Sequence, residues 1–273
     1  MPDAPLDSLP DSSPVALPAL RTVGVTRYVT PLREGGSLPA LVEADDGFLY
    51  VLKFRGAGQG VRALIAELIV GDLARALDLR VPELVFCTLD EAFGRTEPDE
   101  EIQDLLRAST GLNLALHYLA GAGTFDPLLT PVDAEQASRI VWLDAFTLNV
   151  DRTARNTNLL MWHRELWLID HGAALYVHHA GPDWARDVPR PFPQVKDHVL
   201  LPRATALAEA DHYARPRLTP AVLEGIVATV PDDWLFAVDP DAEPAAQRAA
   251  YVGFLARRLA ASATFVQEAE DAR

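Results

Sequence analysis

The sequence predicts an α+β fold in which a small β-rich lobe with one key helix precedes a larger, mainly helical lobe. Three observations predict this arrangement. Between residues 22 and 54, β-branched and aromatic residues gather in three runs that turn-forming stretches separate. Residues 61–79 then place apolar side chains at helical spacing. After residue 132, four helical patterns are interrupted by a single β-hairpin pattern.

The small lobe is expected to span residues 21–90. TVGVTRYVT, LPALVEA and FLYVLKF predict three antiparallel strands, because REGGS and DDG between them are turn signals. RGAGQG then predicts a flexible loop that leads into the helix of residues 61–79. RVPELVFCTLD, at residues 80–90, predicts a further strand that closes the small sheet.

The large lobe is expected to span residues 91–263. PDEEIQDLLRAS and DAEQASRIVWLDAFTLNV predict helices, and Asp133 suits the N-cap of the second because Gln136 follows three residues later. LLMW and LWLID predict the hairpin, and an irregular Pro- and His-rich region follows it to about residue 203. Three more helices are expected at 204–214, 220–229 and 244–261. Residues 1–20 predict a disordered leader, and residues 264–273 predict a flexible tail.

Composition and charge exclude several classes of protein. The 273 residues include 24 basic and 39 acidic ones, which gives a formal net charge of −15. Such a balance disfavours direct binding to nucleic acid or to an anionic membrane. No apolar run is long enough to span a bilayer, and the first residues lack the pattern of a signal peptide. With Cys87 as the single cysteine, no internal disulfide can form, so a cytoplasmic protein is expected.

Two charged residues stand in apolar surroundings of the small lobe. Lys53 lies at the end of a predicted strand, where it is either a partly buried charge that needs a partner or an edge lysine that prevents aggregation. Glu67 lies on the predicted helix, where its neighbours on the same face are small or apolar and none is basic. The two alternatives for Glu67 are a close approach to another element, such as Lys53, and a solvated helix surface.

A second set of polar residues brackets the predicted hairpin. Asp151 and Asn156 lie in DRTARN, a polar loop between an apolar helix and an apolar strand, and Asp170 ends the hairpin in LIDHG. A carboxylate can orient a hydroxyl, and carboxylate and amide oxygens can bind Mg²⁺. Simple turn chemistry is the alternative, since Asp and Asn are common in loops.

The turn REGGS contributes a weaker signal. Gly35, Gly36 and Ser37 could bring backbone N–H groups up to phosphate oxygens. His171, next to Asp170, is interpreted as a packing or orienting residue. The adjacent His178 and His179 receive no role.

Taken in chain order, these residues form a glycine-rich hairpin, a strand lysine, a helix glutamate, an Asp-x₄-Asn loop and an Asp-x-Gly turn. The chain resembles the HipA-like kinases, bacterial relatives of the serine/threonine kinase HipA, over roughly residues 22–259. PLREGGSLPALVE, YVLKFRGAGQG, DRTARNTNLL and LIDHGAAL carry the resemblance. It implies a bilobal protein-kinase-like fold that binds ATP with Mg²⁺.

The resemblance also implies a role for each residue. Lys53 would hold the α- and β-phosphates of ATP, and Glu67 would position that lysine. Asp151 would orient the attacking hydroxyl, while Asn156 and Asp170 would bind the metal. Three motifs depart from the common protein-kinase pattern: NVDR replaces His-Arg-Asp, DHG replaces DFG, and no APE motif follows.

The expected activity is transfer of the ATP γ-phosphate to a Ser or Thr hydroxyl of a protein substrate. A nucleotide-binding pseudokinase that regulates a partner through its conformation is the alternative from another class. A lipid or small-molecule kinase of the same fold is the third alternative. The resemblance leaves open a regulatory or antitoxin-like partner, and the sequence does not identify the phosphate acceptor.

Overall fold

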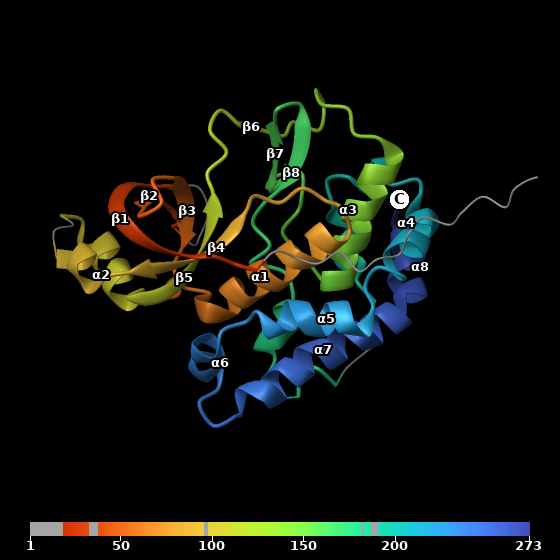
Figure 1. Ribbon diagram of the computed structural model, residues 1–273. Helices are drawn as coiled ribbons and strands as arrows, with labels where there is room; N and C mark the ends of the chain where they lie inside the picture. The colour runs from red at the N-terminus through yellow and green to blue at the C-terminus, as the bar shows by residue number, and fades with distance from the viewer. Residues whose placement is uncertain (1–18, 33–37, 96–97, 182, 187–190) are drawn as a thin grey trace, which may run out of the picture.

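The structure is a computed structural model that describes residues 19–32, 38–95, 98–181, 183–186 and 191–273. Most of the expected leader and the turn residues Gly35, Gly36 and Ser37 lie outside this described part. Figure 1 shows the strands β1 to β5 on one side of the molecule and the helices α3, α4 and α8 on the other. Helices α5, α6 and α7 lie below them, and α1 lies in the middle.

A five-stranded sheet forms the first part of the chain. Its strands are β1 (Thr22–Pro31), β2 (Ala40–Ala44), β3 (Leu49–Lys53), β4 (Leu84–Leu89) and β5 (Gly111–His117). The strand order is β1-β2-β3-β5-β4, and a short parallel pairing of β1 with β4 closes the sheet on itself. The three expected antiparallel strands and the expected fourth strand are confirmed. Alternate residues of β2 and β3 face the core, as their sequence pattern predicts.

Strand β5 was not predicted, and it lies beyond the expected end of the small lobe at residue 90. It follows 3₁₀ helix η1 (Glu91–Arg95) and helix α2 (Glu100–Ala108), and it pairs with both β3 and β4 in the middle of the sheet. Its sequence, GLNLALH, contains Leu and Ala and no β-branched residue, so its strand signal is weak. The sheet therefore draws on residues well beyond 90.

Helix α1 (Gly60–Ala76) confirms the helix expected after the sheet strands. All residues from Leu64 to Ala74 are buried, including Glu67 and Asp72, so this stretch of the helix is enclosed on every face. It contacts β5, α3, α5 and α6, so it is enclosed by both parts of the chain. Gly71 lets the Leu84 side chain approach the helix closely, because a Cβ there would lie 2.7 Å from Leu84 Cδ1.

The second part of the chain is mainly helical. Its helices are α3 (Ala134–Thr147), α4 (Leu207–Ala214), α5 (Pro220–Ala228), α6 (Asp232–Val238), α7 (Pro244–Ala260) and α8 (Ser262–Ala272). A small sheet joins β6 (Gly123–Thr124) to the hairpin of β7 (Leu159–Trp162) and β8 (Glu165–Leu168). The 3₁₀ helices η2 (Tyr176–His179), η3 (Pro193–Asp197) and η4 (Leu201–Arg203) occupy the region expected to be irregular. In the described part of the chain, no helix is long and apolar enough to cross a membrane.

The expected N-cap of α3 and the expected hairpin are confirmed. Asp133 accepts a hydrogen bond from the backbone N–H of Gln136, which is the capping interaction that the sequence predicts. The hairpin pairs Leu159 with Leu168 and Trp162 with Glu165. Helices α4, α5 and α7 also lie within the expected ranges.

Residues 264–272, where a flexible tail was expected, belong to α8, which packs against α3 and α4. Phe265 and Ala269 are buried, and the Phe265 ring lies edge-on to Trp142 with 5.6 Å between the ring centroids. The segment looked like a tail because only one face of the helix is apolar, and charged residues fill the rest.

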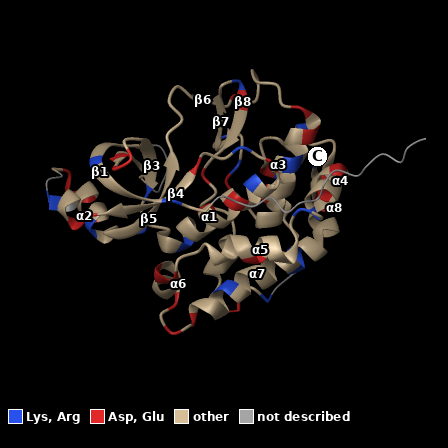
Figure 2. Ribbon diagram, viewed as in Figure 1, with Lys and Arg blue, Asp and Glu red and all other residues tan. Residues whose placement is uncertain are grey.

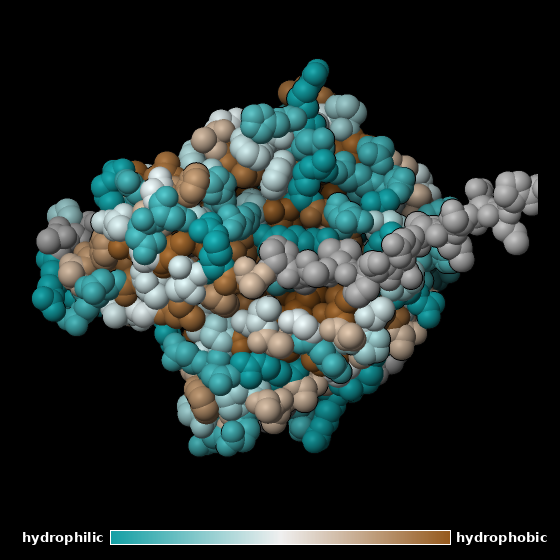
Figure 3. Space-filling view, viewed as in Figure 1, coloured by the Kyte–Doolittle hydropathy of each residue, from teal (hydrophilic) through white to brown (hydrophobic). Residues whose placement is uncertain are grey.

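Helix α6, which was also not predicted, attaches the helical part to the large sheet. The indole N–H of Trp234 donates a hydrogen bond of 3.0 Å to the backbone carbonyl of Leu112 in β5. The Trp234 ring lies 5.6 Å from the ring of Phe86, and Arg55 forms a 2.7 Å ion pair with Asp233. Figure 3 shows hydrophobic surface near the middle of this view, around α1 and α5, and more hydrophilic outer edges.

Candidate active site

Lys53 lies between two carboxylates that come from different elements. Its Nζ is 2.6 Å from Glu67 Oε2 on α1 and 2.6 Å from Asp170 Oδ1 after β8. The side chain of Lys53 is 12% exposed and that of Glu67 is completely buried. The alternatives of an edge lysine and a solvated helix glutamate are therefore wrong.

The electrostatics of this site keep Lys53 and Glu67 charged near neutral pH. Burial alone would lower the pKa of the Lys53 ammonium, but Glu67 and Asp170 more than offset it and hold that pKa above its ordinary value. Burial would raise the pKa of the Glu67 carboxyl, yet Lys53 and the nearby side chain of His171 hold it well below its ordinary value. A buried charge of this kind is stable only while its partner is present.

The turn after Asp170 is packed directly against α1. The backbone N–H of His171 donates a 2.7 Å hydrogen bond to Glu67 Oε2. A Cβ on Gly172 would lie 3.5 Å from the Cβ of Ala63 in the first turn of α1. The small side chains that precede Glu67 on its helix face therefore allow the close approach that the sequence suggested.

The loop after α3 brings Asp151 together with two asparagines. Asn156 Nδ2 donates to Asp151 Oδ2 at 2.8 Å, and Asn158 Nδ2 donates to the same oxygen at 3.2 Å. The backbone N–H of Asp151 is held by the Asn149 side chain at 3.2 Å. Asp151 and Asn156, which were predicted as a pair, do lie side by side.

Asn158 is a candidate that the sequence interpretation missed. Its carbonyl accepts a 3.1 Å hydrogen bond from the backbone N–H of Ile169, so it lies opposite the residue that precedes Asp170. Asn158 is 8% exposed, whereas Asn156 is exposed. The signal that could have found it is its place directly before the strand LLMW, because the hairpin register then brings it beside the LID end of the other strand.

A buried polar network supports the loop that carries Asp151. It was not predicted from the sequence. Arg152 Nε lies 2.5 Å from Asp144 Oδ2, and both side chains are fully buried. The Arg152 guanidinium also donates to the backbone carbonyl of Asn158. Asn149 Nδ2 donates to Asp144 Oδ1 at 2.9 Å. One ion pair therefore connects α3, the Asp151 loop and the start of β7.

His198 links the network to the segment that precedes η4. Its Nδ1 accepts a 3.0 Å hydrogen bond from the backbone N–H of Leu200, so the ring proton must be on Nε2, which lies 2.9 Å from Asp144 Oδ2. Burial would raise the pKa of the Asp144 carboxyl, but Arg152 and His198 hold it far below its ordinary value. The sequence signal was the lone Asp in the apolar helix stretch IVWLDAF.

The oxygen donors at this site suit a hard divalent cation whose remaining ligands come from outside the protein. The described residues contain no group of three or more His, Cys, Asp or Glu side chains arranged to hold a metal ion. Asp170 and the amide oxygens of Asn156 and Asn158 are the oxygen donors that Mg²⁺ prefers, but Mg²⁺ needs six ligands. The remaining ligands would come from water and from phosphate oxygens of a substrate.

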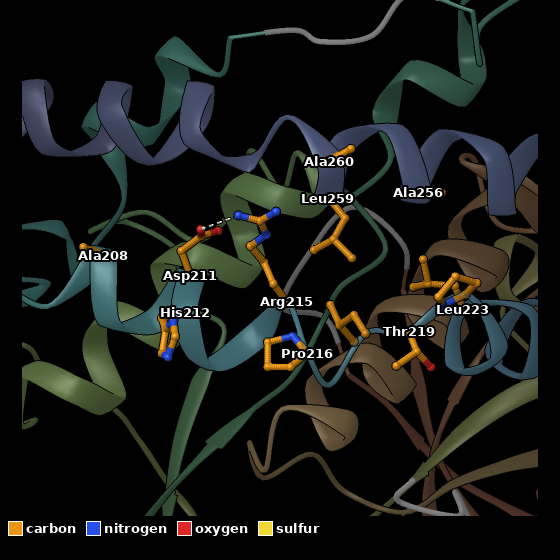
Figure 4. A pocket seen from close by; sticks show the side chains of 12 residues that line it. Ala208, Asp211, His212, Arg215, Pro216, Thr219, Leu223, Ala256, Leu259 and Ala260 are labelled. Atoms are coloured by element: carbon orange, nitrogen blue, oxygen red, sulfur yellow. Dashed lines mark ion pairs between the residues drawn. The ribbon is translucent and has the colours of Figure 1, made fainter. Parts of the chain in front are cut away.

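Two pockets lie in very different surroundings. A small one of about 30 Å³ is lined by Lys53, Asp170, Gly172 and the first turn of α1. A groove of about 790 Å³ lies between α4, α5 and α7, and Figure 4 shows the ion pair of Arg215 with Asp211 among the side chains that line it. None of the predicted site residues lines the larger groove, so its larger volume does not make it the candidate active site.

This chain matches one protein-family model in sequence and resembles a solved kinase structure in fold. A family model described as HipA-like kinase matches residues 25–265. A search of curated protein sequences finds no match. Among solved structures, the Helicobacter pylori proinflammatory kinase CtkA aligns with a TM-score of 0.53 at 13% identity, over 85% of this chain and 93% of CtkA. The Golgi casein kinase with Mn/ADP bound aligns with a TM-score of 0.46 at 12% identity, over 92% of this chain and 73% of that one. The likeness to CtkA shows a kinase fold.

Proposed function

The chain belongs to the HipA-like kinase family, and on that premise we propose that it is an ATP- and Mg²⁺-dependent phosphotransferase with a bilobal kinase architecture, acting on Ser or Thr hydroxyls of a protein. The observation that carries the proposal is the position of Lys53, which contacts Glu67 and Asp170 at 2.6 Å each. A lysine held by a helix glutamate, next to a carboxylate suited to a metal, is the arrangement that kinases use to hold ATP phosphates.

Lys53 would exchange one of its two partners when the nucleotide binds. In the structure its ammonium forms ion pairs with both Glu67 and Asp170. An incoming α- or β-phosphate would take the place of Asp170 on the ammonium, while Glu67 would keep the lysine in position. Asp170 would then be free to hold the metal.

The metal would be bound by Asp170 and by the amide oxygens of Asn156 and Asn158. When bound, Mg²⁺ would offset the charge of the triphosphate and of the transferring phosphoryl group. The Asp151 carboxylate accepts hydrogen bonds from the same two asparagines. The hydrogen bonds from Asn156 and Asn158 to a single oxygen of Asp151 would fix the direction of the other oxygen.

Asp151 would align the acceptor hydroxyl for transfer. The hydroxyl oxygen forms a bond to the γ-phosphorus as the bond from that phosphorus to the β,γ-bridging oxygen breaks, and ADP leaves. The hydroxyl proton passes to Asp151. Little other covalent chemistry is required of the protein, so rate enhancement would come from positioning and from charge stabilisation.

A protein acceptor with basic residues fits the charge of the chain best. The formal net charge is −15, and acidic side chains are frequent on α2, α4 and α6 (Figure 2). Such a surface attracts positively charged partners and repels anionic lipid or nucleic acid. This makes a lipid acceptor the less attractive alternative.

Phosphoproteomics tests the proposal and identifies the acceptor together. Cells that express the wild type are compared with cells that express Asp151→Ala at the same level. We expect new Ser or Thr phosphosites only with the wild type. If both proteins give the same phosphoproteome while the wild type binds Mg-ATP, a pseudokinase is supported. A phosphorylated lipid or metabolite in place of protein sites would support the third alternative.

A further inference from the structure

The two oxygens of the Glu67 carboxylate have very different surroundings. Oε2 accepts hydrogen bonds from Lys53 Nζ and from the backbone N–H of His171. Oε1 is buried and has no hydrogen-bond partner among the described residues. A buried carboxylate oxygen without a partner is costly and needs an explanation.

The imidazole of His171 also lacks hydrogen-bond partners. The residue is completely buried, and neither ring nitrogen has a hydrogen-bond partner in the described part of the chain. His171 Nδ1 lies 3.5 Å from Glu67 Oε1, which is slightly beyond a good N–H···O distance. An approach of roughly half an ångström would satisfy both atoms with one hydrogen bond. Nδ1 must then carry the ring proton.

We propose that His171 is a positioning residue whose imidazole Nδ1–H donates to Glu67 Oε1 when nucleotide occupies the site. The inference rests on the proposed function. At that stage Lys53 would turn toward phosphate, and Glu67 would lose part of the charge that now stabilises it. A donor from His171 keeps the carboxylate facing Lys53, and because His171 follows Asp170, the contact ties the metal-binding turn to α1.

The side chain matters here, and not only the backbone. Any residue at this position can donate its backbone N–H to Glu67 Oε2. Only a side chain with a donor near the imidazole Nδ1 can reach Oε1. Phenylalanine would fill the same buried space without a donor, whereas asparagine places an amide nitrogen near the position of Nδ1.

Binding of Mg-ADP by calorimetry and ATP kinetics test the proposal with the full chain. We expect His171→Phe to raise the Kd for Mg-ADP and the KM for ATP about tenfold, since a hydrogen bond to a charged group is lost. His171→Asn should remain within about threefold of the wild type. In a Glu67→Gln background, His171→Phe should add less than about a twofold effect, because residues that act through one contact are not additive. Equal Kd values for His171→Phe and the wild type, or additive effects, would overturn the inference.

A second measurement needs no variant and covers a failure of His171→Phe to fold. In ¹⁵N-histidine-labelled wild type with Mg-ADP, the resonances of His171 should show a proton on Nδ1. A proton on Nε2 would overturn the inference. A wild type that binds neither Mg-ADP nor Mg-ATP would count against the proposed function instead, so the two failures are distinguishable.

Discussion

Arg152 and Asp144 form an ion pair of 2.5 Å in which both side chains are fully buried. Arg152 directly follows the candidate catalytic residue Asp151, and Asp144 lies on α3, which precedes the loop. The loop that carries Asp151 is therefore held by an ion pair that is buried away from solvent. Its geometry depends on both partners, because a buried charge without its partner is strongly destabilising.

Replacing Arg152 should cost far more stability than replacing an arginine at the surface. We expect Arg152→Met to lower the free energy of unfolding by about 3–5 kcal/mol, since Asp144 would remain buried without its main partner. The matched control is Arg186→Met, because Arg186 pairs with Asp183 where both side chains are 80% and 69% exposed. The control should change stability by less than about 1 kcal/mol. Equal losses in urea unfolding would show that the buried pair is not the support described here.

Lys53 should contribute to stability as well as to nucleotide binding. Lys53→Met leaves Glu67 buried and charged, and we expect a loss of about 3 kcal/mol in unfolding free energy. Adding Glu67→Gln removes the orphaned charge, so the double variant should be more stable than Lys53→Met alone. Urea unfolding measures both. A double variant that is no more stable than the single one would contradict the geometry given for this pair.

The two asparagines of the loop should differ in metal binding. Asn158 lies opposite Ile169 and is nearly buried, so we expect Asn158→Ala to weaken Mn²⁺ binding in the presence of ADP by about tenfold or more. Asn156→Ala should have a smaller effect. Thr157→Ala, between them, is the control and should bind Mn²⁺ as the wild type does. Electron paramagnetic resonance titration measures free Mn²⁺. A larger loss from Asn156→Ala would assign the main amide ligand to Asn156 instead.

His178 should make the protein sensitive to mild acid. Burial lowers the pKa of its imidazole from 6.5 to about 3, so between these pH values the unfolded chain binds a proton that the folded chain does not. Stability should therefore fall as the pH drops from 6.5 toward 3, by at most about 1.4 kcal/mol per pH unit.

The His178 contribution can be separated from that of the buried carboxylates between pH 6.5 and 5. In this window the buried carboxylates of Glu67 and Asp144 stay ionised in the folded state, because their pKa values are held below the ordinary ones. His178→Asn should flatten the slope of unfolding free energy against pH there. This flattening should exceed that in the control His163→Asn, because His163 lies at an exposed turn. An unchanged slope in His178→Asn would refute this account of the acid sensitivity.

Local sequence signals predict the parts of the fold that depend on local interactions. The strand pattern around Lys53 and the apolar helix that carries Glu67 are short-range features, and both are confirmed. The Asp133 cap is equally local. The small neighbours of Glu67 even indicate a close contact, although they do not say with what.

Features that depend on contacts between distant parts of the chain could not be predicted from local sequence signals. Strand β5 has a weak intrinsic preference and is stabilised by pairing on both sides. His198 reaches Asp144 from 54 residues away along the chain, and nothing in its local sequence indicates this partner. Trp234 anchors α6 to a strand 122 residues earlier in the chain. In each case tertiary packing, and not local preference, decides the structure.

Transfer of label from γ-labelled ATP tests the central claim most directly. Purified wild type and Asp151→Ala are incubated with Mg²⁺, labelled ATP and an extract of dephosphorylated proteins, with chelator as the metal control. We predict label on protein with the wild type, no label with chelator, and at least about a hundredfold less label with Asp151→Ala. Equal labelling by the wild type and Asp151→Ala would contradict the assignment of this site as the phosphotransfer centre.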